Sequence, residues 1–151
     1  MHFYTIYSAG FMLEHMEELN ELSRNMLQNA VLLENELIKE GVPMISRNTT
    51  ALEPPTHHCW IKPELRQKAF DLYTTMERIG LLANYRLLPY DIGYGLRLGL
   101  SGATRSGLRP TDIPHLAHLI SNAYKHDYTP SLKSETEDFI HTIKQRNSYN
   151  G

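Results

Sequence analysis

The spacing of apolar residues predicts that helices and short strands alternate along this chain. Apolar side chains first recur at steps of three and four, which places them on one face of a long helix that ends at Gly41. The positions of this stripe are Leu19, Leu22, Met26, Ala30, Leu33 and Leu37. Residues 1–16 carry no charged side chain before Glu14 and favour a buried helix ahead of the stripe. We therefore expect both segments to lie in the core.

Shorter apolar patterns continue after Gly41. Extended segments are predicted at 42–46, 56–61 and 81–88, and where Leu96, Leu98 and Leu100 alternate with other residues. Helices are predicted from Pro63 to Gly80, after a cap at Thr111, and over about 132–146. The expected fold class is α+β, with a small antiparallel sheet covered by helices on one face and preceded by the long N-terminal helix. The chain then divides into a helical lead-in, 1–41, and a small α/β C-terminal domain, 42–151.

Composition narrows the classes of function. The chain has 151 residues, 41% of them hydrophobic, which is enough for one compact core. A net charge of −2 gives no electrostatic basis for binding nucleic acid or an anionic membrane. A single cysteine, Cys59, excludes an internal disulfide and fits a reducing compartment. We find no signal-peptide pattern and no apolar run of about 18 residues, so we expect a cytoplasmic protein.

The stretch 95–108 is the strongest candidate for chemistry because it sets one arginine among leucines and glycines. Alternation puts Arg97 on the strand face opposite the leucines, and flanking Gly95 and Gly99 lack the Cβ atoms that would block a ligand. The planar guanidinium matches a carboxylate bidentately, so the pattern indicates a carboxylate clamp. A surface arginine on an edge strand is the alternative. The glycines do not cradle a phosphate, because G-x-G-x-x-G fails at Leu98 and no Lys-Ser/Thr follows.

The run Thr56-His57-His58-Cys59 suggests a metal site at first sight. However, adjacent residues in a strand point to opposite faces and cannot close one tetrahedral site together. We therefore expect no metal here.

The arginine stretch resembles the substrate-arginine strand of serine hydroxymethyltransferases, usually written G-I-R-I-G-T-P-A-x-T-x-R-G. The positions that keep the family's spacing are Gly95, Arg97, Gly99, Thr104 and Gly107. Leu100 and Ser101 replace its Thr-Pro. The opening Met1-His2 and the pair Asn29-Ala30 also match, and His58 falls on the histidine of the family's T-D-N-H segment. A polar residue at a strand start is the other interpretation of His58.

The resemblance implies the C-terminal small domain of a fold-type I enzyme that uses pyridoxal phosphate. In the family a lysine that follows a T-x-x-H-K run in the large domain holds this cofactor, and the sequence contains no such run. The resemblance therefore implies that pyridoxal phosphate is bound by a large domain or subunit absent from this chain, within a homo- or hetero-oligomer. The chain alone is then expected to be inactive.

Two departures from the family fall on its folate side. Arg86 stands where the second asparagine of the N-K-N-x-x-P loop, a folate contact, would be, while Asn84 keeps the first. The Ser-Pro-Phe insert before Gly95 is also missing. Because Arg97 is retained, the resemblance implies that the amino-acid substrate is kept and argues against tetrahydrofolate.

The resemblance thus implies a role in cleaving or forming the Cα–Cβ bond of a glycine-, serine- or threonine-type amino acid. Arg97 is expected to bind the substrate carboxylate, and His58, Asn84 and Arg86 to line the site. Two alternatives stay open. One is a folate-free aldolase or transaldolase, and the other is a non-catalytic interaction module that keeps the fold.

Overall fold

The computed structural model describes residues 10–45 and 56–148. Its elements are α2 (Met16–Lys39), β1 (His58–Ile61), α3 (Arg66–Ile79), β2 (Asn84–Leu87), η1 (Pro89–Asp91), β3 (Tyr94–Gly99), α4 (Ser101–Arg105), η2 (Pro110–Asp112), α5 (Ile113–His126) and α6 (Pro130–Ser148). The matches at Met1-His2 and the predicted structure of 1–9 lie outside the described residues, as does Ser46 of the first extended segment.

The three strands form one antiparallel sheet in the order β1-β3-β2, so β3 has a partner on each side. Beside β1, the backbone N–H of Ile45 donates to the Trp60 carbonyl at 2.9 Å, and Met44 forms a bridge with Ile61. The segment predicted as a strand from residue 42 is therefore a short extension of the β1 edge. None of the described helices is long and apolar enough to cross a membrane.

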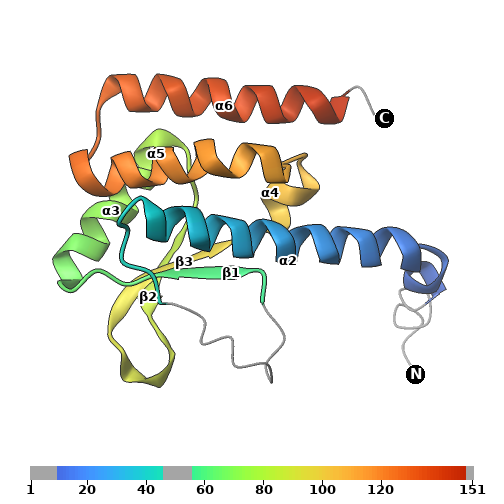
Figure 1. Cartoon of the computed structure of the whole chain (residues 1–151), viewed down its shortest axis with the longest axis horizontal. Coiled ribbons are helices and arrows are strands. Elements are labelled where there is room, and N and C mark those ends of the chain that lie inside the picture. The colour runs from blue at the N-terminus through green and yellow to red at the C-terminus, as the bar shows by residue number, and fades with distance from the viewer. Residues whose placement is uncertain (1–9, 46–55, 149–151) are drawn as a thin grey trace.

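Helices cover one face of this sheet (Figure 1). Leu96 and Leu98 of β3 point into that layer and are buried, together with Cys59 and Ile61 of β1. The helices α2 and α3 lie against the strands, and α5 and α6 pack outside them. The predicted α+β fold, a small antiparallel sheet with helices on one face and a long helix before it, is confirmed.

The apolar stripe of α2 is buried over only half its length. Ala30, Leu33 and Leu37 are completely buried, whereas Leu19, Leu22 and Met26 stay partly exposed. The first turns of α2 extend past α4 in Figure 1. Ahead of α2 the side chains of Phe11, Met12 and Leu13 are 51%, 56% and 69% exposed. The prediction that the whole stripe lies in the core is therefore wrong, and so is that prediction for the described residues 10–16 ahead of it, because these side chains are partly or largely exposed.

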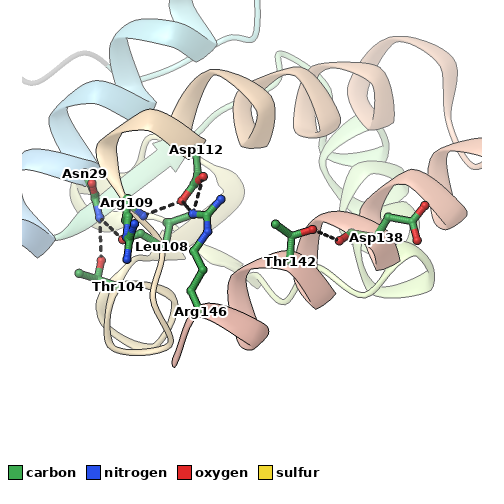
Figure 2. A network of polar contacts seen from close by, with 8 residues as sticks. All are labelled: Asn29, Thr104, Leu108, Arg109, Asp112, Asp138, Thr142 and Arg146. Atoms are coloured by element: carbon green, nitrogen blue, oxygen red, sulfur yellow. Dashed lines mark hydrogen bonds and ion pairs between the residues drawn. The ribbon is translucent and has the colours of Figure 1, made fainter. Parts of the chain in front are cut away.

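Asn29 ties the long helix to the segment that follows β3. Its side-chain N–H₂ donates to the Thr104 hydroxyl and to the Leu108 carbonyl, each at 3.1 Å, and the side chain is fully buried (Figure 2). These two bonds join residues more than 70 positions apart in the chain. They fix the path of the chain immediately after the strand that carries Arg97.

Asp112 forms a second polar link, between the start of α5 and the end of α6 (Figure 2). Its carboxylate accepts hydrogen bonds from Arg146 Nη1 at 2.7 and 2.8 Å and from the Arg109 backbone N–H at 2.9 Å. The helix cap predicted at Thr111 is wrong, since Asp112 occupies the N-cap position of α5 and Thr111 lies within η2. The Asp112 side chain makes no cap hydrogen bond to α5. It binds Arg146 instead and so links the last helix to the start of α5.

We expect Asp112→Ala to lower the free energy of unfolding by about 2–4 kcal/mol, because it leaves a partly buried guanidinium and a backbone N–H without their acceptor. Urea denaturation followed by circular dichroism measures the change. Glu137→Ala is the matched control, since the Lys133–Glu137 pair is exposed, at 3.7 Å, and its removal should cost under about 1 kcal/mol. Similar losses in both variants would contradict the assignment of a structural role to Asp112.

Gly95 is required by packing. A Cβ atom at this position would lie 2.4 Å from the Ile61 carbonyl oxygen and 2.6 Å from Leu88 Cδ1. A backbone atom of the neighbouring strand cannot yield without disturbing the pairing of β1 with β3. The interpretation that Gly95 clears an approach for a ligand is therefore wrong, because the chain itself fills that space. At Gly99 a Cβ atom would meet only the His58 ring, at an ordinary 3.5 Å.

We expect Gly95→Ala to destabilise the fold by about 1–3 kcal/mol through overpacking. Gly102→Ala provides the control, because this glycine lies in α4 with nothing within 4 Å of an added Cβ. Alanine there should be neutral or should stabilise by up to about 1 kcal/mol. Urea unfolding of both variants tests the pair, and an unchanged midpoint for Gly95→Ala would contradict the packing argument.

Candidate functional site

The strand register gathers the predicted site residues on one face of the sheet. Arg97 lies directly opposite Trp60 of β1 and Asn84 of β2. Directly paired residues point to the same side of a sheet, and so do residues two apart along a strand. This side is opposite the buried leucines of β3, and we call it the arginine face. Its members are His58, Trp60, Asn84, Arg86 and Arg97.

Arg97 has no partner among the described residues, unlike Arg66 and Arg146. Its side chain is half-buried, and no hydrogen bond or ion pair to its guanidinium occurs within the described part of the chain. Arg146, by contrast, is held by Asp112, and Arg66 stacks on the Tyr94 ring at 4.0 Å. A half-buried cation that lacks an acidic neighbour favours binding of an anion that enters from outside the chain.

Arg66 shows what a structural arginine looks like in this chain. Its Nε donates to the Tyr85 hydroxyl at 3.1 Å, and this hydrogen bond raises the pKa of Arg66 above its ordinary value. Tyr85 in turn stacks on Tyr94, with ring centroids 5.4 Å apart. The group is satisfied by aromatic neighbours at the outer edge of the helix-covered face, so it has no requirement for a ligand.

His58 lies at one end of the arginine face. Its ring is half-buried, contacts His57 with centroids 3.9 Å apart, and lies over Gly99. The register pairs it with Gly99. It lies two residues before Trp60 on β1 and therefore on the same side of the sheet as Trp60 and Arg97. His58 is therefore well placed to border a ligand at Arg97.

Asn84 and Arg86 belong to the edge strand β2 and are both exposed. Asn84 is the direct neighbour of Arg97, whereas Arg86 is paired with Gly95, further toward the turn. The Arg86 Nε donates to the Leu87 carbonyl at 3.4 Å, which holds the side chain along its own strand. The structure therefore brings Asn84 next to Arg97 and sets Arg86 at the periphery.

Trp60 is the member of the arginine face that sequence reasoning missed. The sequence around Trp60 indicates only that it belongs to a strand. Which residue lies opposite Arg97 depends on the register between β1 and β3, and no short stretch of sequence encodes that register. The indole N–H is buried and has no hydrogen-bond partner among the residues that the structure describes.

The described residues do not form a metal site. No three His, Cys, Asp or Glu side chains come close enough together within residues 10–45 and 56–148 to hold a metal ion. The lysines are engaged elsewhere, as the Nζ of Lys62 is by the Pro63 carbonyl at 2.7 Å and the Nζ of Lys39 by Glu36 at 2.6 Å. Lys125 and Lys133 pair with surface glutamates. These four lysines are thus held by acceptors of the chain itself.

The fold is shared with a solved enzyme structure. The crystal structure of L-threonine transaldolase from Pseudomonas fluorescens in the internal aldimine state superimposes with a TM-score of 0.71 at 22% identity. The match covers 82% of this chain and 28% of that one. The protein therefore shares the fold of the matched part of that transaldolase chain.

Curated relatives confirm the predicted resemblance. The serine hydroxymethyltransferase of Acidothermus cellulolyticus is 26% identical over 147 residues, which are 91% of this chain and 32% of the relative. That of Thermoplasma acidophilum is 25% identical over 133 residues, 82% of this chain and 30% of the relative. No family model matches the chain. The chain is thus similar to serine hydroxymethyltransferases over about a third of their length.

Proposed function

We propose that this chain is the small domain or subunit of a pyridoxal phosphate enzyme related to serine hydroxymethyltransferases. Its substrate is a glycine-, serine- or threonine-type amino acid, and the reaction cleaves or forms the Cα–Cβ bond. The observation that carries the proposal is Arg97, which keeps the family's motif and is half-buried without an acidic partner in the described chain. The relatives and the fold support it.

Arg97 supplies orientation in this proposal. Its guanidinium donates two parallel hydrogen bonds to the substrate α-carboxylate, which fixes the rotation of the amino acid about its Cα. The scissile bond is then held at a constant angle to the cofactor. The β3 strand is suited to this task because pairing on both edges leaves its backbone little freedom. Pyridoxal phosphate, once bound by the partner, supplies the electron sink.

A partner is part of the proposal because the sequence lacks the T-x-x-H-K run whose lysine holds the cofactor in the family. The chain covers 32% and 30% of the two serine hydroxymethyltransferases compared above. We propose that the cofactor lysine belongs to a large domain or subunit that contacts the helical lead-in, residues 1–41. Residues 42–151 form the small domain. The exposed side chains of Phe11, Met12 and Leu13 offer apolar surface in this lead-in for such an assembly.

We expect Arg97→Lys to lower kcat/KM for cleavage of serine or threonine by about 30- to 1000-fold, since lysine cannot form the bidentate pair. The loss corresponds to about 2–4 kcal/mol of transition-state stabilisation. The measurement needs the chain joined to a cofactor-binding domain, such as the N-terminal two thirds of the Acidothermus cellulolyticus relative. The chain alone should show no turnover.

Arg109→Lys is the control for this experiment, because the exposed Arg109 contacts Asp112 through its backbone N–H. Equal losses for both arginines would indicate a general electrostatic effect and would contradict the clamp. An assembled complex that binds cofactor normally and yet has no activity would favour the alternative, a non-catalytic interaction module.

We further propose that tetrahydrofolate is not the one-carbon acceptor, which favours an aldolase or transaldolase reaction. Arg86 has no acceptor atom, so it cannot accept hydrogen bonds from pterin N–H groups as an asparagine carbonyl can. A site that has lost such a partner rejects its former ligand strongly. The shortened connection before Gly95, formed by η1, also lacks the family's Ser-Pro-Phe insert.

In the same assembled enzyme, tetrahydrofolate should leave the exchange rate of the glycine α-proton unchanged. Exchange is followed by proton NMR in deuterated buffer, with and without the folate. A folate-dependent acceleration would overturn this part of the proposal. Arg86→Asn then serves as the reciprocal variant, and a gain of folate response in it would locate the discrimination at this residue.

A further inference from the structure

The Trp60 side chain carries an unmet hydrogen-bonding requirement. Its Nε1 atom is buried, and no residue within 10–45 or 56–148 accepts a hydrogen bond from it. An indole N–H can only donate, so the requirement has to be met by an acceptor. Leaving a buried donor unpaired costs about 1–3 kcal/mol, which is unusual enough in a folded protein to need a reason.

The second unmet donor on this face is its nearest cross-strand neighbour. Trp60 and Arg97 are directly paired between β1 and β3. Directly opposite residues have Cβ atoms about 4.5–5.5 Å apart on the same side of the sheet. Arg97 is half-buried and also lacks a partner in the described chain. Both groups are donors without acceptor capacity, so each leaves the other unsatisfied.

A single carboxylate satisfies both requirements. An ionised carboxylate is an acceptor with two oxygens and about four lone-pair directions, so it takes the two bonds of a guanidinium and still has capacity for another donor. A phosphate would also accept, but the glycine spacing for a phosphate cradle is absent, and the other arginine of this face, Arg86, is peripheral and donates to the Leu87 carbonyl.

We infer that Trp60 is a second positioning residue of the substrate site, whose indole N–H donates to the carboxylate that Arg97 binds. This inference rests on the proposed role of Arg97 and adds a contact to it. The flat indole also limits the space beside the carboxylate on the β1 side. The site therefore prefers small amino acids and other short monocarboxylates.

The composition makes the inference directly measurable. Trp60 is the only tryptophan, so a proton–nitrogen correlation spectrum of the ¹⁵N-labelled full chain contains one indole N–H signal. Titration with acetate and with glycine should move this signal downfield and saturate, as should the backbone amides next to Arg97. Sodium chloride at the same ionic strength should not reproduce the saturating shift.

Two replacements of Trp60 test its contribution. Trp60→Phe, which removes the N–H, should weaken acetate binding by about 10-fold, the loss of one hydrogen bond to a charged group. Benzothienylalanine incorporated in place of tryptophan keeps the ring size and replaces the N–H by sulfur. Because the chain has one tryptophan, this analogue changes only position 60. It should give the same loss with an unchanged amide spectrum elsewhere.

The outcomes separate this inference from the proposed function. If acetate moves the amides near Arg97 while the indole signal stays fixed, or if the benzothienyl analogue binds as tightly as the natural chain, the inference is overturned and the clamp stands. If acetate moves neither set of signals, the two-donor site is overturned as well. The clamp is then decided independently by the kinetics of Arg97→Lys in the assembled enzyme.

Discussion

The central position of β3 in the sheet is the constraint on which the rest of the molecule depends. Pairing with β1 on one edge and β2 on the other fixes every side chain of β3 to one of two faces. Leu96 and Leu98 are thereby committed to the core, and Arg97 to the opposite side. A shift of one residue in this register would bury the guanidinium among leucines and expose the core positions. Gly95 helps to exclude that shift, since only glycine allows the Ile61 carbonyl to approach so closely.

The polar links around β3 hold the helices at defined places. Asn29 fixes the segment after β3 to α2, and Asp112 with Arg146 fixes α6 to the start of α5. The first link joins elements far apart in the chain and the second joins consecutive ones, and both include buried side chains whose partners are specific. Hydrogen bonds of this kind add little net free energy, yet breaking one leaves a buried group unpaired. They therefore act mainly by selecting one arrangement of the helical layer over others that bury similar apolar area.

The two faces of the sheet are used differently. The helix-covered face is a packed core, whereas the arginine face collects polar and aromatic side chains from three strands. The first half of α2 is partly exposed, and two donors on the arginine face, the Trp60 indole N–H and the Arg97 guanidinium, lack acceptors among the described residues. In the proposed assembly the first is covered by the cofactor-binding partner and the second by the substrate carboxylate.

Local pattern was sufficient for most of the long helices and the strands, for the fold class and for the choice of Arg97 as the principal candidate, but not for the short helix α4. Alternating leucines specify a strand with Arg97 on the other side, and Pro63 with Gly80 encloses a helix observed from Arg66 to Ile79. Periodicity reports which side of an element is apolar, because the periods of helix and strand are properties of the backbone alone. It does not report what covers that side, so the first half of the α2 stripe was expected in the core and is partly exposed. The pairing of Arg97 with Trp60 and Asn84, the reason for Gly95 and the partner of Asp112 depend on which segments meet across the sheet and between helices. Only the tertiary structure decides these contacts, because they join residues that no short-range spacing relates.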